Sequence, residues 1–240
     1  MKNKNRRILF AIVIVGALAG AGYYLFTTFF QTTGRSARVI EWIRHAQDHS
    51  DWSVQAGTLC APNAPFVMPT DGLVGYLWDD SFRPGHRHTG LDIFGGTDVG
   101  LTPIVAAYPG YLTRLPEWKS AVIVRVPSDP LEPGRQIWLY YTHMADPYGN
   151  SFISSAFPAG TSEVYIEAGT LLGYQGNYTG DAANPSGIHL HFSIVLSDSE
   201  GHFTNELEIR NTLDPSPYFG IPLNGKTAPD EVVVCGNAEN

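Results

Sequence analysis

The chain has 240 residues, of which 43% are hydrophobic and only 16% are charged, and it contains 25 glycines and 17 prolines. This composition excludes a disordered chain and indicates a globular, turn-rich, β-rich protein with one well-packed domain. Four basic residues precede position 8, so the formal charge of −8 for the whole chain becomes −12 for the remainder. An acidic body without a basic cluster argues against nucleic acid as a partner.

An uncharged, apolar segment, residues 8–30, directly follows the basic residues 1–7. A helix of this length would span about 34 Å, which is enough to cross a bilayer with some tilt. We therefore expect residues 1–7 to form a cytoplasmic tail and residues 8–30 a transmembrane anchor, with the rest of the chain outside the cytoplasm. A cleaved signal peptide is the alternative, because Ala17-Leu18-Ala19 and Ala19-Gly20-Ala21 resemble cleavage sites.

Residues 31–65, which follow the anchor, are predicted to contain a short helix and a linker. Residues 36–47 place four apolar side chains at helical spacing, which predicts an amphipathic helix. Residues 50–66 are polar and contain proline, as linkers do.

Short strands separated by glycine and proline are the main signal in residues 66–222, which we expect to form the principal domain. The predicted strands are residues 104–115, 121–126, 137–144, 164–166, 171–174 and 189–196. The turn at residues 127–134 joins two of them as a hairpin. No helix-length periodic segment interrupts the strands, so the predicted fold is mostly β, with an antiparallel sheet or sandwich core. In the C-terminal tail, residues 223–240, the segment 232–235 could add an edge strand.

Cys60 and Cys235 are the only cysteines of the chain. In an exported protein they predict one disulfide bond, which would join the beginning of the domain to the tail. Two free thiols are the alternative.

Two histidines alternate with apolar residues near the end of the domain. In the predicted strand 189–196 every second residue is apolar and shares one face, while His189 and His191 share the other face. Imidazoles two residues apart on a strand lie about 6.5 Å apart and point the same way, close enough to share one metal ion or one reacting group. A surface strand that carries two histidines by chance is the alternative.

Two further segments contain residues of the same ligand types. His88 and Asp92 would be about 13 Å apart on a straight strand, which is too far for one ion, so the chain must bend between them, and Gly90 permits the bend. His143 lies near the end of the predicted strand 137–144. Each segment alone is also compatible with an exposed turn or an ordinary strand end.

Considered together, these residues predict a catalytic metal site. Imidazole and carboxylate ligands with an open fourth position are typical of catalytic zinc. His88, Asp92 and one residue of the His189 and His191 pair would supply the ligands. Two histidines would remain, one to take a proton from water and one to stabilise the oxyanion or protonate the leaving group.

With these motifs, residues 70–196 resemble the lysostaphin-type (LytM-type) zinc metallopeptidases, which cut peptide bonds in bacterial peptidoglycan. The resemblance rests on His88-x-x-x-Asp92, on Tyr141-Thr142-His143 at the end of a strand, and on His189-x-His191 before an apolar strand. It implies a β fold of the duplicated hybrid motif type, Zn²⁺ bound by His88, Asp92 and His191, and a catalytic pair formed by His143 and His189. Which residue of the pair is the general base stays open. His86 is a less favoured ligand candidate.

The resemblance implies a zinc-dependent metallo-endopeptidase that acts on the peptides of peptidoglycan. It would be a single-pass protein of the cell membrane, attached through residues 8–30, with the catalytic domain outside the cytoplasm and with any regulatory protein partner unknown. The loop at residues 177–186 is longer than the corresponding link in the family, so the resemblance does not define that wall of the substrate groove. The alternatives are a non-catalytic relative that binds or activates a cell-wall hydrolase, and a zinc peptidase that acts on other proteins.

Overall fold

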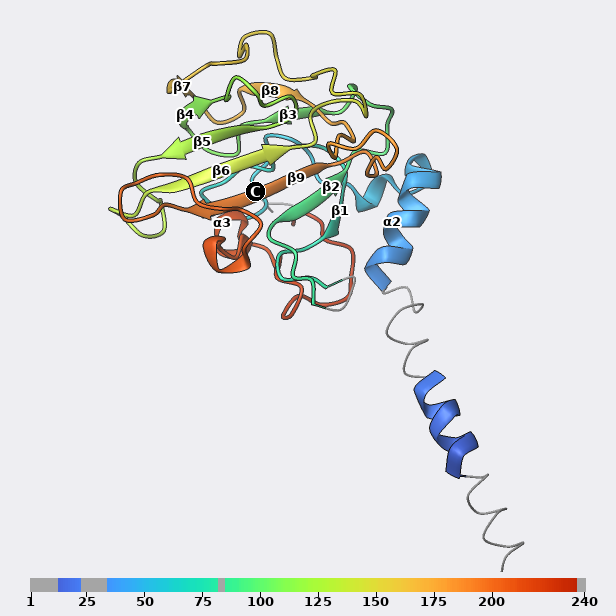
Figure 1. Ribbon diagram of the computed structural model, residues 1–240. Helices are drawn as coiled ribbons and strands as arrows, with labels where there is room; N and C mark the ends of the chain where they lie inside the picture. The colour runs from blue at the N-terminus through green and yellow to red at the C-terminus, as the bar shows by residue number, and fades with distance from the viewer. Residues whose placement is uncertain (1–12, 23–33, 82–84, 237–240) are drawn as a thin grey trace, which may run out of the picture.

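The computed structural model describes residues 13–22, 34–81 and 85–236. Its largest element is a seven-stranded sheet in the order β1-β2-β9-β6-β5-β4-β7, accompanied by a two-stranded sheet of β3 and β8 (Figure 1). All pairings between these strands are antiparallel. The prediction of a mostly antiparallel β fold is therefore confirmed.

The large sheet contains β1 (Leu73–Tyr76), β2 (Leu91–Phe94), β9 (Leu190–Leu196), β6 (Ile137–Thr142), β5 (Val122–Val126), β4 (Gly110–Thr113) and β7 (Val164–Ile166). The small sheet contains β3 (Pro103–Val105) and β8 (Leu171–Tyr174). The helices are α2 (Gly34–His45) and α3 (Ser216–Phe219), with short 3-10 helices at Ala46–Asp48, Ser50–Trp52 and Ile209–Asn211.

The main hydrophobic core includes side chains from both sheets. Alternate residues of β9, such as Phe192 and Ile194, are buried together with Ile104 of β3 and Leu172 of β8. Since successive side chains of a strand point to opposite faces, the alternate residues His191, Ser193 and Val195 lie on the other face of the large sheet. The apolar alternation of β9 therefore fixes which face carries the candidate site.

Most of the strands agree with the sequence prediction. The segments predicted at 121–126, 137–144, 164–166, 171–174 and 189–196 form β5, β6, β7, β8 and β9 within two residues at each end. The single strand predicted at 104–115 is wrong, because the chain forms β3 and β4 in different sheets. Pro109 lies between them and cannot donate a hydrogen bond to a strand ladder. The edge strand predicted at 232–235 is also wrong, since this described segment forms no strand.

The helix predicted at residues 36–47 is α2, which continues into a 3-10 turn. Its buried residues Val39 and Trp42 pack against Leu73 of β1 and Phe94 of β2. The predicted domain limits at 66 and 222 stay a prediction.

The predicted disulfide bond between Cys60 and Cys235 is confirmed. The two Cα atoms lie 4.2 Å apart although the residues are separated by 175 positions in the sequence. The bond therefore attaches the C-terminal tail to the segment that precedes β1.

Residues 13–22 form an exposed helix, separate from the sheets in Figure 1. The predicted tail, residues 1–7, and the other parts of the predicted anchor, residues 8–12 and 23–30, lie outside the described residues. Among the helices that the structure does describe, none is both long and apolar enough to cross a membrane. The transmembrane anchor therefore stays a prediction.

Candidate metal centre

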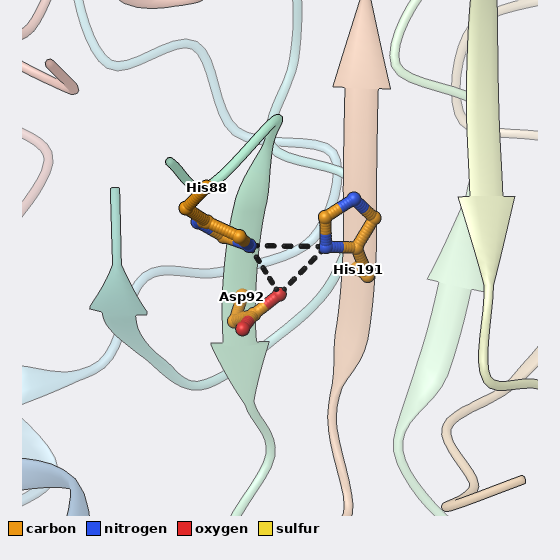
Figure 2. A group of neighbouring side chains, drawn as sticks. All are labelled: His88, Asp92 and His191. Carbon is orange, nitrogen blue, oxygen red and sulfur yellow. Dashed lines mark hydrogen bonds and ion pairs between the residues drawn. The ribbon is translucent and has the colours of Figure 1, made fainter. Parts of the chain in front are cut away.

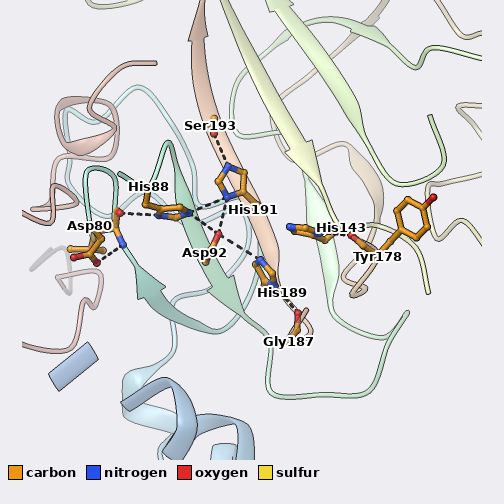
Figure 3. Close-up of polar contacts among 10 residues, drawn as sticks. Asp80, His88, Asp92, His143, Tyr178, Gly187, His189, His191 and Ser193 are labelled. Atoms are coloured by element: carbon orange, nitrogen blue, oxygen red, sulfur yellow. Dashed lines mark hydrogen bonds and ion pairs between the residues drawn. The ribbon is translucent and has the colours of Figure 1, made fainter. Parts of the chain in front are cut away.

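Three neighbouring strands bring the candidate residues together. In the pairing of β2 with β9, Asp92 lies opposite His191, and in the pairing of β9 with β6, His191 lies opposite Thr142. Residues directly opposite on antiparallel strands point to the same side of the sheet. His88 approaches from the segment before β2, and His143 directly follows β6 (Figure 3).

His88, Asp92 and His191 meet at one point (Figure 2). The Oδ1 atom of Asp92 lies 3.1 Å from His88 Nε2 and 2.8 Å from His191 Nδ1, and these two nitrogens are 3.1 Å apart. In a tetrahedral zinc site with metal–ligand distances of about 2.0–2.1 Å, the ligand atoms are about 3.3 Å from one another. Two imidazoles and one carboxylate in this spacing fit a zinc ion with little rearrangement.

Gly90 permits this arrangement through its small size. A Cβ atom at this position would lie 2.1 Å from the carbonyl oxygen of Phe192 and 2.5 Å from the Oγ atom of Ser193, both on β9. Gly90 is not among the residues with positive φ, so it is not needed for a left-handed conformation. The sequence predicted a bend at Gly90, and the structure adds that the glycine lets the backbone approach β9 closely.

Backbone carbonyl oxygens orient three of the histidines. The Nδ1–H groups donate to carbonyl oxygens in three pairs, namely His88 to Leu77 at 2.9 Å, His143 to Tyr178 at 2.6 Å and His189 to Gly187 at 2.6 Å. A neutral imidazole that donates through Nδ1 keeps Nε2 as an acceptor. His88 can thus offer Nε2 to a metal ion, and His143 and His189 can accept a proton at Nε2.

His143 and His189 lie beside the three candidate ligands. The ring centroids of His143 and His189 are 4.4 Å apart, and His189 Nε2 lies 3.6 Å from Asp92 Oδ1. The φ angle of His143 is 72°, in the left-handed region that residues other than glycine rarely adopt. All five side chains line one cavity of about 400 Å³.

The charge state of Asp92 and three of the imidazoles suits a bound cation. Burial raises the pKa of Asp92, but the surrounding histidines outweigh burial and hold it well below its ordinary value. Burial lowers the pKa of His189 and His191, and burial together with His189 lowers the pKa of His143 to about 4. At neutral pH the carboxylate is ionised and these imidazoles are neutral, which is the form that binds a metal ion or accepts a proton.

His88 differs from the other histidines. Burial lowers its pKa, but the negative charge of Asp92 and the hydrogen bond between them outweigh burial and raise it above the ordinary value. The environment of Asp92 therefore favours a positive charge next to the carboxylate. A divalent cation between the same atoms would supply this positive charge in place of a proton.

The structure brings all five predicted site residues together. Within the described part of the chain, the group whose ligand atoms could share a metal ion consists of His88, Asp92 and His191. His86 lines the same cavity, but its ring centroid lies 6.5 Å from that of His88 and it is not part of this group. The roles assigned to the residues from the sequence remain predictions.

The groups that orient the histidines were not predicted from the sequence. Phe94 stacks on His189, with ring centroids 5.0 Å apart and an interplanar angle of 23°. Leu77 and Tyr178 contribute only backbone oxygens. Every residue has a carbonyl oxygen, so no side-chain pattern could have identified these two residues. Phe94 could have been considered from the sequence, because it is an aromatic residue two positions after Asp92.

No protein-family model matches the sequence, and no curated protein matches it either. Among solved structures, the catalytic domain of the antimicrobial peptidase lysostaphin from Staphylococcus simulans is 18% identical, with a TM-score of 0.39 over 66% of this chain and 93% of that chain. A structure of lysostaphin itself is 20% identical, with a TM-score of 0.40 over 70% of this chain and 56% of that chain.

A catalytic-domain mutant of the prophage-encoded M23 protein EnpA from Enterococcus faecalis is 20% identical, with a TM-score of 0.36 over 61% of this chain and 92% of that chain. The match thus covers nearly the whole of two isolated catalytic domains but only 56% of the lysostaphin chain. At these TM-scores, what the site does has to be argued from its own side chains.

Proposed function

We propose that this protein is a zinc-dependent metallo-endopeptidase that hydrolyses peptide bonds in the peptides of bacterial peptidoglycan. The observation that carries the proposal is the convergence of His88, Asp92 and His191, with ligand atoms 2.8–3.1 Å apart, beside the two neutral histidines His143 and His189. Two imidazoles and one carboxylate form a donor set of catalytic zinc sites, with a position left for water.

The side chains divide into a ligand set and a proton-transfer pair. His88, Asp92 and His191 would hold Zn²⁺, which when bound polarises a carbonyl group and lowers the pKa of water. His143 and His189, each held through Nδ1 by a backbone carbonyl, would act at Nε2. One would accept a proton from water at Nε2, and this proton would then be donated to the leaving nitrogen, either by that histidine or through the other one.

The substrate class and the location extend the same proposal. Peptidoglycan peptides are proposed because the motifs of residues 70–196 resemble those of lysostaphin-type peptidases. We also propose that the domain acts outside the cytoplasm, attached to the membrane through residues 8–30. The disulfide bond between Cys60 and Cys235 supports this location, because disulfides persist in oxidising compartments.

The test measures zinc content and hydrolysis of purified peptidoglycan for the full chain and for single variants. His88→Ala and His191→Ala are expected to lose both zinc and activity. His143→Ala is expected to keep zinc and to lose activity by about 10²–10⁴-fold, because it removes a proton-transfer group and no ligand. His202→Ala removes an exposed histidine and should change neither quantity.

Four results would contradict the proposal in different ways. A wild-type chain without zinc would refute the metal site, and a His88→Ala variant that still cuts peptidoglycan would refute the ligand assignment. A zinc-loaded wild-type chain that cuts other peptides but no peptidoglycan would leave a zinc peptidase with a different substrate. Zinc binding without any hydrolysis would favour the non-catalytic alternative.

A further inference from the structure

Helix α2 packs against the edge of the sheet that carries the candidate metal centre (Figure 1). Its side chains contact residues of β1, β2 and the segment between them, although none of its own residues belongs to the candidate ligands or the proton-transfer pair. Two separate series of contacts connect α2 to the site. One ends at His88 and the other at His189.

The first series of contacts starts with Arg35. Its side chain is only 10% exposed, and its Nε atom lies 3.4 Å from Asp80 Oδ2. This Oδ2 atom also accepts a hydrogen bond of 3.0 Å from the backbone N–H of Leu77, the residue whose carbonyl oxygen orients the His88 ring. The backbone oxygen of Asp80 accepts the N–H of His88 at 2.8 Å. Asp80 thus holds both the backbone of His88 and the acceptor of its imidazole (Figure 3).

The second series of contacts starts with Trp42, which is buried, with 3% of its surface exposed. Its Nε1–H group donates a hydrogen bond of 2.7 Å to the carbonyl oxygen of Phe94 at the end of β2. The ring of Phe94 stacks on the imidazole of His189 at a centroid distance of 5.0 Å. Trp42 therefore fixes the residue that forms one wall around His189.

We propose that α2 is a positioning element of the metal centre, with Arg35 acting on His88 through Asp80 and Trp42 acting on His189 through Phe94. The inference rests on the proposed function, because it concerns metal binding and proton transfer at that site. Arg35, Asp80 and Trp42 are positioning residues and not ligands. Removal of a group that orients a ligand histidine typically lowers metal affinity by about 10–100-fold.

The first test measures the affinity of the full chain for Zn²⁺ alone by competition with a chromophoric chelator. Asp80→Ala is expected to weaken zinc binding by about tenfold, since it removes the acceptor of the Leu77 N–H. Asp80→Asn keeps an acceptor oxygen and should restore most of the affinity. Arg35 contacts His88 only through Asp80, so Arg35→Met should weaken zinc binding by less than Asp80→Ala.

Arg38→Met is the matched control. Arg38 lies on the same helix and also forms an ion pair, but its partner is Asp230 in the C-terminal tail, which is far more exposed than Asp80. This variant removes a contact of α2 with the tail without touching Asp80, so zinc affinity should equal that of the wild type.

The second test separates kcat from KM. Trp42→Phe removes the hydrogen bond to Phe94 while keeping an aromatic ring, and His189 is not a proposed ligand. We expect kcat to fall by about tenfold or more, because a small displacement of a catalytic group reduces the rate strongly, while KM and zinc affinity stay unchanged. Ile40 lies on the same helix, is exposed and is not part of the apolar cluster around Phe94, so Ile40→Ala should leave kcat unchanged.

The outcomes distinguish the two proposals. If the wild type binds Zn²⁺ and the Asp80→Ala and Arg35→Met variants bind it equally tightly, the positioning role is overturned while the proposed function stands. If Asp80→Ala does not fold, the comparison of Arg35→Met with Arg38→Met decides, and equal affinities overturn the inference. A wild-type chain that binds no Zn²⁺ overturns the proposed function and, with it, the inference.

Discussion

Replacing Gly90 by alanine would place a methyl group directly before β2, where the backbone lies against β9. The new Cβ atom would lie 2.1 Å from the carbonyl oxygen of Phe192, and contacts below 3.0 Å are essentially never observed for Cβ atoms. The obstacle is backbone, so no side chain can rotate away. The two strands would have to separate by about 1 Å to relieve the contact.

This separation has two consequences of different size. Overpacking of this kind costs about 1–3 kcal/mol of unfolding free energy. The effect on the metal centre should be larger, because Asp92 on β2 and His191 on β9 lie opposite each other and ligand distances tolerate only about 0.2 Å. We expect Gly90→Ala to weaken zinc binding by more than about tenfold. Competition with a chelator would measure the zinc affinity, and a denaturant titration would measure the free energy of unfolding.

Gly110→Ala provides a control with the same kind of clash. Its Cβ atom would lie 2.5 Å from the carbonyl oxygen of Arg125, where β4 pairs with β5, and neither strand carries a candidate ligand. This variant should lose stability and keep its zinc affinity. If Gly90→Ala binds zinc as tightly as the wild type, the spacing of β2 and β9 does not determine the metal site and the reasoning is refuted.

Two further predictions concern stability outside the site. Reduction of the disulfide between Cys60 and Cys235 should lower the free energy of unfolding by about 2–4 kcal/mol, and an unchanged denaturant midpoint would contradict this. Tyr218→Phe removes a hydrogen bond of 2.7 Å to buried Asp129 and should cost about 1.5–3 kcal/mol at neutral pH. Burial raises the pKa of Asp129, but hydrogen bonds from Tyr218, a backbone N–H and Arg135 outweigh it and lower the pKa. The stabilisation is therefore present above about pH 4 and lost as pH falls through the folded-state pKa, so the cost of Tyr218→Phe should shrink in acid, as denaturant titrations across pH would reveal.

The sequence was most informative where a periodic pattern and a chemical motif coincide. In β9 the alternation of apolar residues predicted both the strand and the face on which His189 and His191 lie, and the structure has this face. The same period did not distinguish β3 from β4, because apolar residues continue across the turn at Pro109. The strands β1 and β2 were not predicted, and their length is not the reason, because β7 and β8 are no longer and were predicted.

The convergence of the site depends on strand pairing, which local sequence does not specify. The motif suggested that His88 and Asp92 meet, but the pairing of Asp92 with His191 joins residues 99 positions apart. The contact of Arg35 with Asp80 likewise requires α2 to pack on the sheet. The sequence does not indicate which carboxylate a charged residue on a helix will contact.

The left-handed backbone of His143, with φ of 72°, bears on any attempt to redesign this protein. A residue other than glycine held in this region costs on the order of 1–3 kcal/mol, whereas glycine adopts it readily. A procedure that optimises folding stability alone would therefore select glycine at position 143 and delete the imidazole. Stability and activity would be in conflict at this residue, so an engineered variant that is to remain active has to exclude position 143 from its stabilising substitutions.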